Sequence, residues 1–158
     1  MLRPALESDL DTVIELIHAL ADYEREPDAV KLDRESLRQH LFGPRPYAEV
    51  ILAETSAGET AGFALFFHNF STWEGCPGIY LEDLFVKPEH RGQGHGKALL
   101  VELARIAHER GCKRLEWSVL DWNEPSIAFY KALGAVPMDE WTIYRVTGPA
   151  LESLATRE

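Results

Sequence analysis

The middle of the chain reads Val86-Lys87-Pro88-Glu89-His90-Arg91-Gly92-Gln93-Gly94-His95-Gly96-Lys97. An apolar segment from Tyr80 to Val86 runs into this glycine-rich turn, and an amphipathic pattern from about Gly94 to Arg110 follows it. Because glycine has no Cβ, the backbone N–H groups of the turn can approach a ligand closely. The positive end of the helix dipole adds to their attraction for anions. The stretch therefore predicts a strand, a phosphate-binding turn and a helix in succession.

Two common phosphate loops do not match this turn. The P-loop requires a Gly-Lys-Ser/Thr ending, which the turn lacks. The dinucleotide-binding pattern Gly-x-Gly-x-x-Gly requires a different spacing from glycines at 92, 94 and 96. Two interpretations stay open at this point, namely a site for another phosphate-bearing ligand and a glycine-rich surface turn.

Length and composition favour one globular domain over residues 1–158. The longest uninterrupted apolar run, Phe63 to Phe67, is too short to cross a bilayer, and the N-terminus shows no signal-peptide pattern. Two cysteines, Cys76 and Cys112, form neither a disulfide framework nor a metal pattern. We therefore expect a cytoplasmic protein with reduced thiols, no membrane partner and no bound metal.

The charge of the chain is unevenly distributed. The net charge is −10, yet residues 87–114 carry seven Lys or Arg against three acidic residues. A basic phosphate turn in an acidic body fits an anionic cofactor and a small cationic substrate, and it argues against nucleic acid as a partner. The alternative, that the acidity only aids solubility, stays open.

Hydrophobic periodicity and turn residues predict the order of the elements. The expected elements are a helix from Ser8, capped through Asp11 and stopped by Pro27; a helix over 33–41; strands over 48–54, 60–69 and 78–86; a helix over 94–110; a strand over 113–120; a helix over about 123–134; and a last strand over 141–146. This order predicts an α/β fold of the α+β type, with a mixed, mostly antiparallel central sheet flanked by helices.

Three separated motifs carry a resemblance to a known family. They are Tyr80-Leu81-Glu82-Asp83-Leu84-Phe85-Val86, then Arg91-Gly92-Gln93-Gly94-His95-Gly96, and then Asp121-Trp122-Asn123-Glu124-Pro125-Ser126-Ile127-Ala128-Phe129-Tyr130-Lys131-Ala132-Leu133-Gly134-Ala135. The pattern Arg-x-x-Gly-x-Gly resembles the acetyl-CoA pyrophosphate loop of the GNAT N-acetyltransferases, whose element order this chain shares. The Glu-Asp pair, the Trp-Asn-Glu-Pro-Ser block and Tyr23-Glu24 resemble the diamine (spermidine/spermine) N-acetyltransferases and their thialysine-acetylating relatives. The resemblance covers nearly the whole chain and implies the GNAT fold, acetyl-CoA as cosubstrate and a homodimer.

Acetyl transfer to an amine requires a base and an acid. An alkyl ammonium has a pKa near that of lysine, about 10.4, so the reactive free amine is scarce at neutral pH. The resemblance places the amine beside Glu82, which we expect to accept its proton through water; the alternative is a surface carboxylate. Tyr130 matches the family's general acid, because a phenol stays protonated at pH 7 and can protonate a leaving thiolate. The alternative for Tyr130 is a core tyrosine.

The resemblance also implies the residues that bind coenzyme and substrate. The expected coenzyme-binding residues are Leu84, Phe85, Val86, Arg91, Gly92, Gln93, Gly94, His95, Gly96, Lys97, Asn123, Ser126 and Tyr130. The expected substrate-binding residues are Tyr23, Glu24, Glu82, Asp83, Glu116 and Glu140. Asn123 and Ser126 also make sense as a plain helix cap. Glu116 stands where polyamine acetyltransferases commonly have a histidine, which leaves the identity of the amine open.

The predicted function is transfer of an acetyl group from acetyl-CoA to the primary amine of a small polyamine or lysine-like diamine. Neither cysteine lies in the two strongest motifs, so we expect direct attack by the amine in a ternary complex. Two alternatives stay open: an acetyltransferase for protein or peptide amines, and a non-catalytic sensor that binds CoA.

Overall fold

The structure, a computed structural model, describes residues 1–157 in two compact units, Met1–Leu120 and the segment that starts at Asp121. Among these residues, none of the helices has both the length and the apolar character needed to span a bilayer.

The first unit is built on a five-stranded sheet in the order β1-β2-β3-β4-β5. Its strands are β1 (Leu2–Pro4), β2 (Glu49–Glu54), β3 (Thr60–Ser71), β4 (Cys76–Val86) and β5 (Leu115–Trp117). The first four strands pair antiparallel, whereas β5 runs parallel to β4. The mixed, mostly antiparallel sheet expected from the sequence is therefore confirmed.

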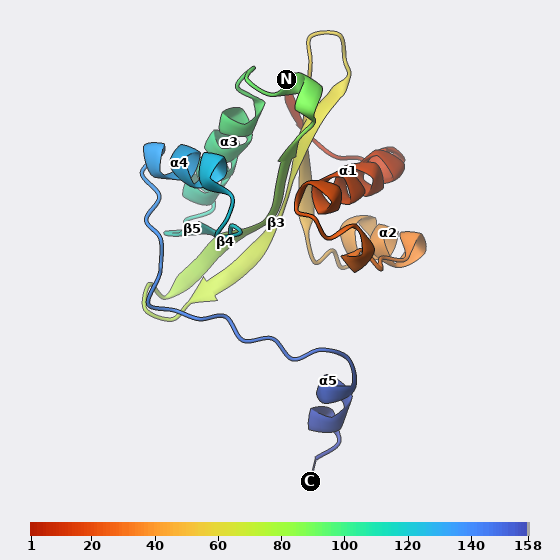
Figure 1. Ribbon diagram of the computed structural model, residues 1–158, viewed down its shortest axis with the longest axis vertical. Helices are drawn as coiled ribbons and strands as arrows, with labels where there is room; N and C mark the ends of the chain where they lie inside the picture. Colours follow the sequence, from red (N-terminus) through yellow and green to blue (C-terminus); the bar gives the residue numbers. More distant parts are fainter. Residues whose placement is uncertain (158) are drawn as a thin grey trace. The chain divides into compact units, whose positions relative to one another are not determined.

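Three α-helices cover the two faces of this sheet. They are α1 (Leu10–Tyr23), α2 (Arg34–Phe42) and α3 (His95–Glu109). A short 3-10 turn precedes each of them: η1 (Glu7–Asp9), η2 (Pro27–Ala29) and η3 (Pro88–His90). Helices α1 and α2 lie on one face and α3 lies on the other (Figure 1). Val13, Leu16 and Leu20 of α1 fall at helical spacing and are buried in one cluster with sheet residues such as Phe63 and Phe85. Burial of such side chains stabilises the unit by about 1.5–3 kcal/mol each.

The start of α1 differs from the prediction. The helix begins at Leu10 after η1, and the carboxylate of Asp9 accepts a hydrogen bond from the N–H of Leu6 (2.7 Å). The predicted cap through Ser8 and Asp11 was wrong, because the Asp11 carboxylate instead binds Arg34 Nε at 2.8 Å. Helix α2 starts as expected, with the Asp33 carboxylate accepting the Ser36 N–H at 2.9 Å.

The two edge strands of the sheet differ from the prediction: β1 was not predicted, and β5 was predicted too long. The sequence does not predict the strand at Leu2–Pro4, and the strand predicted over 113–120 covers only Leu115–Trp117 in the structure. Both strands contain three residues, which is too short for a period of two to be recognised. Their extent follows from the backbone partners that neighbouring strands offer.

The second unit contains α4 (Glu124–Ala132) and α5 (Gly148–Ala155). The predicted strand over 141–146 was wrong: these residues form no strand, and the N–H of Trp141 donates to the carbonyl of Met138 at 3.1 Å. Alternating apolar residues make a strand only where another strand supplies hydrogen-bond partners. Helix α5 was not predicted; it begins after Thr147 with Pro149 in its first turn, a favourable place for proline.

Candidate functional site

The candidate site is built around an irregularity in β4. Leu81 pairs with Phe66 and Asp83 pairs with Leu65, so Glu82 is an extra residue without a partner on β3. A bulge of this kind bends a strand and redirects its side chains. The two acidic residues singled out in the sequence therefore stand at the bend, Glu82 exposed and Asp83 half-buried.

Three carboxylates interact at this bend. Burial, together with the negative charges of Glu82 and Glu24, raises the pKa of Asp83 from its ordinary value of 3.8 to about 6. Burial and the charge of Glu82 also raise the pKa of Glu24, the residue that follows α1. Neighbouring negative charges make each carboxyl group harder to ionise, and a bound cation would reduce the repulsion between them. Of the predicted substrate residues, the structure thus brings Glu24, Glu82 and Asp83 together.

The edge of β4 next to this bend is open. The ladder between β4 and β5 ends at Leu81 and Trp117, while β4 continues to Val86. Within the described chain, residues 84–86 therefore have a strand partner only on the side of β3. An extended ligand with amide groups can pair with such an edge as an added strand does.

The glycine-rich turn connects this open edge to α3. Gly92 and Gly94 have φ angles of 75° and 85°, which strongly favour glycine, and Gly94 is the N-cap of α3. A Cβ at Gly96 would lie 3.8 Å from Val86 Cγ2, so the first turn of α3 is adjacent to the end of β4. The N–H groups at the start of a helix have no partner within the helix. The predicted coenzyme residues Gly92, Gln93, Gly94, His95, Gly96 and Lys97 all lie in this turn or in the first helical turn.

Arg91 ties the turn to the end of α1. Its Nε donates to the carbonyl of Val86 at 3.0 Å. Its guanidinium carbon lies 4.9 Å from the ring centroid of Tyr23 and 5.6 Å from that of Phe85. These contacts join the predicted coenzyme residues to the segment that carries Glu24, a connection that the sequence spacing did not indicate.

Glu116 lies on β5 opposite Tyr80 of β4. Its Oε1 accepts a hydrogen bond from Asn69 Nδ2 at 3.3 Å, and the hydroxyls of Tyr80 and Ser118 are 2.8 Å apart. Asn69 and Tyr80 were not singled out as site residues in the sequence, because only the strand pairing makes them neighbours of Glu116.

Four predicted site residues belong to the second unit and are described within it. Asn123 is the N-cap of α4, and its side chain accepts the Ser126 N–H at 3.4 Å, so the plain helix-cap interpretation of this pair is confirmed. Tyr130 lies on α4 with its ring 5.6 Å from that of Phe129. Glu140 stands in a turn before residues 141–147, which form neither helix nor strand.

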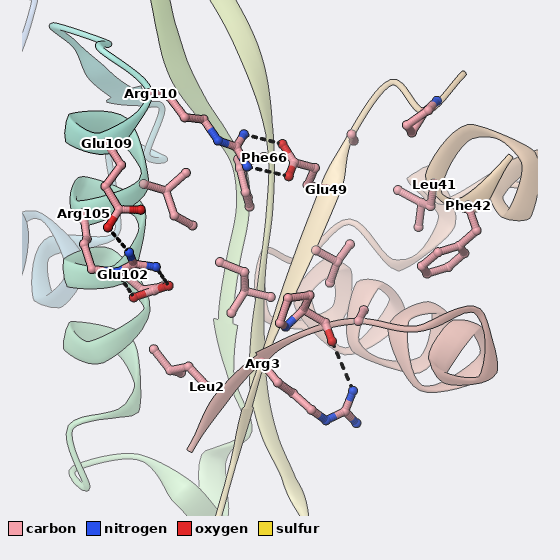
Figure 2. Close-up of a pocket in the computed structure, with 17 residues that line it drawn as sticks. Leu2, Arg3, Leu41, Phe42, Glu49, Phe66, Glu102, Arg105, Glu109 and Arg110 are labelled. Carbon is pink, nitrogen blue, oxygen red and sulfur yellow. Dashed lines mark hydrogen bonds and ion pairs between the residues drawn. The ribbon is translucent and has the colours of Figure 1, made fainter. Parts of the chain in front are cut away.

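A cavity of about 450 Å³ lies elsewhere in the first unit, between α3 and the strands β1 and β2. Figure 2 shows two of the arginines around it bound to carboxylates, Arg110 to Glu49 and Arg105 to Glu102 and Glu109. None of the predicted site residues lines it. Arg3, which also lines the cavity, binds Asp9 and Glu54. The arginines of the cavity are therefore all paired with carboxylates, so the bend of β4 is the better candidate for chemistry.

The chain matches known proteins both in sequence and in fold. The profile described as "Acetyltransferase (GNAT) family" matches residues 13–135. The chain is similar to a thialysine N-epsilon-acetyltransferase of Bos taurus, with 41% identity over 98% of this chain and 96% of that protein. It is also similar to an L-ornithine N5-acetyltransferase of Arabidopsis thaliana, with 30% identity over 97% of this chain and 86% of that protein. Among solved structures, an integron cassette protein from the mobile metagenome of V. cholerae matches with a TM-score of 0.81 and 30% identity, over 99% of this chain and 98% of that one.

Proposed function

Because the chain belongs to the GNAT acetyltransferase family, we propose that it transfers an acetyl group from acetyl-CoA to the primary amine of a small polyamine or lysine-like diamine. The reaction is direct attack by the amine in a ternary complex.

The observation that carries this proposal is the position of the carboxylates. Glu24, Glu82 and Asp83 interact at the bend where β4 loses its partner β5. The open edge starts there and ends at the glycine-rich turn and the first turn of α3. The edge and turn fit a long ligand with amide groups and a diphosphate, and the carboxylates fit an ammonium group next to its reactive end. Acetyl-CoA supplies the thioester.

The printed activities of the relatives support a small amine with a second polar end. One relative is named for thialysine and another for ornithine, and each of these compounds carries a side-chain amine. Three carboxylates within reach of one another suit a compact dication, whose charges they would neutralise. They offer less to a neutral peptide chain.

The carboxylates would also manage the proton of the amine. Deprotonating an ammonium of pKa about 10.4 at pH 7 costs roughly 4–5 kcal/mol. Glu82 is the proposed base, because it is exposed at the bend and its carboxylate can pass a proton to water. Asp83 and Glu24 hold the charge of the substrate. Glu82 first takes a proton from the ammonium by way of water, which leaves a neutral amine. The N–C bond to the acetyl group then forms, the C–S bond of the thioester breaks, and the nitrogen loses its second proton to water.

The remaining residues complete the proposal. The backbone of Leu84, Phe85 and Val86 would bind the arm of the coenzyme, and the turn that ends at Lys97 would bind its diphosphate. Tyr130 would return a proton to the departing thiolate, and Asn123 with Ser126 would contact the arm as well as cap α4. Glu116 and Glu140 would add negative charge for the substrate. The thiol of Cys76 is not part of the proposed chemistry, since Cys76 lies six residues before Glu82, about 20 Å along an extended strand. A cytoplasmic homodimer is proposed from the family resemblance alone.

An acetyl-CoA consumption assay across putrescine, spermidine, spermine, lysine, ornithine and thialysine tests this function. We expect turnover with at least one of these small amines and little with peptides that carry a free N-terminus or lysine. Faster turnover of the peptides would favour the protein acetyltransferase. Binding of CoA by calorimetry without turnover of any amine would favour the sensor.

Replacing Tyr130 with phenylalanine tests the proposed acid. The variant should have a turnover number lower by roughly 100-fold, because it cannot donate a proton to the thiolate. Its affinity for acetyl-CoA, measured by calorimetry, should stay within a factor of about two, since the ring is retained. An unchanged turnover number would remove Tyr130 from this role.

A further inference from the structure

Arg25 occupies an unusual backbone conformation directly after Glu24. Among the described residues, it is the one residue other than glycine with a positive φ angle, 64°. Non-glycine residues rarely adopt this left-handed conformation, because their Cβ approaches the backbone too closely. An arginine kept in such a position invites a functional explanation.

Helices α1, α3 and α4 end in the same hydrogen-bonding pattern, so the position of Arg25 can be compared with the equivalent positions of the other two helices. At the end of α1, the Arg25 N–H donates to Asp22 and the Glu26 N–H donates to Ala21, at 3.1 and 2.9 Å. The residues after α3 and α4 repeat both bonds, with Gly111 and Gly134 in the place of Arg25. Their φ angles are 72° and 90°. This is the Schellman motif, in which glycine is the usual residue at that place.

The exceptional arginine stands at the carboxylate cluster. Its Cα is about 3.8 Å from that of Glu24, the spacing of consecutive residues, and the carboxyl of Glu24 interacts with Glu82 and Asp83. Arg25 is exposed to solvent. Glu24 and Arg25 are consecutive, so the end of α1 carries one acidic and one basic residue. With Glu82 as the proposed base at the reacting amine, Glu24 is left for the other charged end of the substrate. By contrast, the residue that precedes Gly111 in the first unit, Arg110, binds Glu49 at 2.7 Å rather than the carboxylates at the bend of β4.

Two kinds of small amine differ in what they place at that far end. A polyamine presents only another ammonium, for which Glu24 is sufficient. An amino acid with a side-chain amine presents both an α-ammonium and an α-carboxylate. Arginine binds carboxylates through two parallel N–H donors, which gives geometric selectivity as well as attraction.

Building on the proposed function, we propose that Arg25 is a specificity-determining residue that binds the α-carboxylate of a lysine- or ornithine-like substrate, while Glu24 binds its α-ammonium. Arg25 thereby favours amino acids over polyamines. The strained conformation at the end of α1 is retained because glycine there would offer the α-carboxylate no partner.

The test uses substrate pairs that differ only in the α-carboxylate: ornithine with putrescine, and lysine with cadaverine. In the unmodified protein, kcat/KM should be at least about tenfold higher for the amino acid of each pair. Arg25→Gly, which suits the backbone, should lower this preference ratio by roughly 10- to 100-fold. Arg25→Lys should retain part of the preference, because it keeps the charge but loses the paired donors.

Control measurements separate this role from others. Arg45→Gln removes one positive charge from an exposed arginine outside the site, and it should leave the preference ratio unchanged. Thermal unfolding should show Arg25→Gly to be folded, with a Tm equal to or above that of the unmodified protein. If Arg25→Gly changes both members of each pair equally, Arg25 only balances the charge of the carboxylates and the inference is wrong.

Two further outcomes distinguish the inference from the proposed function. A protein that acetylates polyamines faster than amino acids retains the proposed function but contradicts the role of Arg25. A protein that binds CoA and acetylates no member of either pair contradicts the proposed function, and the inference with it.

Discussion

The ends of α1 and α3 share their backbone hydrogen bonds but differ in the residue they place in the left-handed position. After α3 this residue is Gly111, and the neighbouring Arg110 binds Glu49 at 2.7 Å. After α1 it is Arg25, and the neighbouring Glu24 interacts with the carboxylates at the bend of β4. The same left-handed conformation is thus adopted by glycine, which tolerates it, after α3 and by arginine, for which it is strained, after α1. This difference is the basis of the specificity role proposed for Arg25 at the end of α1.

The largest expected effect contrasts the carboxylate at the bend of β4, which interacts with Glu24 at the end of α1, with a carboxylate at the end of α3. Glu82→Gln should lower kcat/KM for the amine by roughly 100-fold or more, because the amine loses its proton acceptor. It should also change the dependence of the rate on pH. The control is Glu109→Gln at the end of α3, where the carboxylate is exposed and binds Arg105. Equal rates for the Glu82 variant and this control would remove Glu82 from the role of proton acceptor.

The next effect concerns stability as a function of pH. The folded-state pKa of Asp83 is raised from 3.8 to about 6, so the folded protein holds this proton more tightly than the unfolded chain does. Its contribution is therefore complete below pH 4 and is lost as the pH rises through about 6. Asp83→Asn should remove this loss and stabilise the protein at pH 7 by up to roughly 3 kcal/mol.

Urea unfolding at several pH values between 4 and 7 measures this difference. Asp9→Asn is the contrasting variant, because the Arg3 guanidinium lowers the pKa of Asp9. Asp9 therefore contributes stability that is lost as the pH falls, and replacing it should destabilise the protein at neutral pH. The prediction for Asp83 fails if its variant shows the same pH dependence as the unmodified protein.

A reciprocal exchange measures the strain at the two helix ends. Arg25→Gly should raise the free energy of unfolding by about 1 kcal/mol, and Gly111→Arg should lower it by a similar amount. A Cβ at Gly111 would meet no atom within 4 Å, so the effect there comes from the backbone conformation rather than from a clash. Chemical denaturation of both variants checks the signs. A destabilising Arg25→Gly would mean that the side chain of Arg25 stabilises the fold itself.

The smallest effect concerns the ring that Arg91 contacts. Tyr23→Leu removes the cation–π contact at 4.9 Å, which is worth about 0.5–1 kcal/mol. We expect KM for the amine to rise by roughly two- to fivefold, because Glu24 is held less firmly. Tyr47→Leu is the matched control. It removes a similar contact outside the site, in which the guanidinium carbon of Arg45 lies 5.7 Å from the ring centroid of Tyr47. A similar KM for both variants would argue against a link between Arg91 and the end of α1.

The sequence alone determined most of the architecture of the first unit and the type of the site. The periodicity of Val13 and Leu20, the glycines at 92 and 94 and the acidic pair before them each depend on local chemistry, and local chemistry can be read from neighbouring residues. The three motifs carried the family resemblance, and the profile over residues 13–135 bears it out.

Only the tertiary structure decided which of these residues act together. The bulge at Glu82 depends on the register between β3 and β4, and the contact of Arg91 with Tyr23 joins residues 68 positions apart in the chain. The wrong strand over 141–146 has the same cause, because a strand exists only where another supplies its hydrogen-bond partners. The left-handed conformation of Arg25 is also visible only in the structure, because the neighbouring residues in the sequence do not mark this position as one that favours glycine. Sequence reports what each segment favours by itself, whereas register and contact between distant segments set the geometry in which a site works.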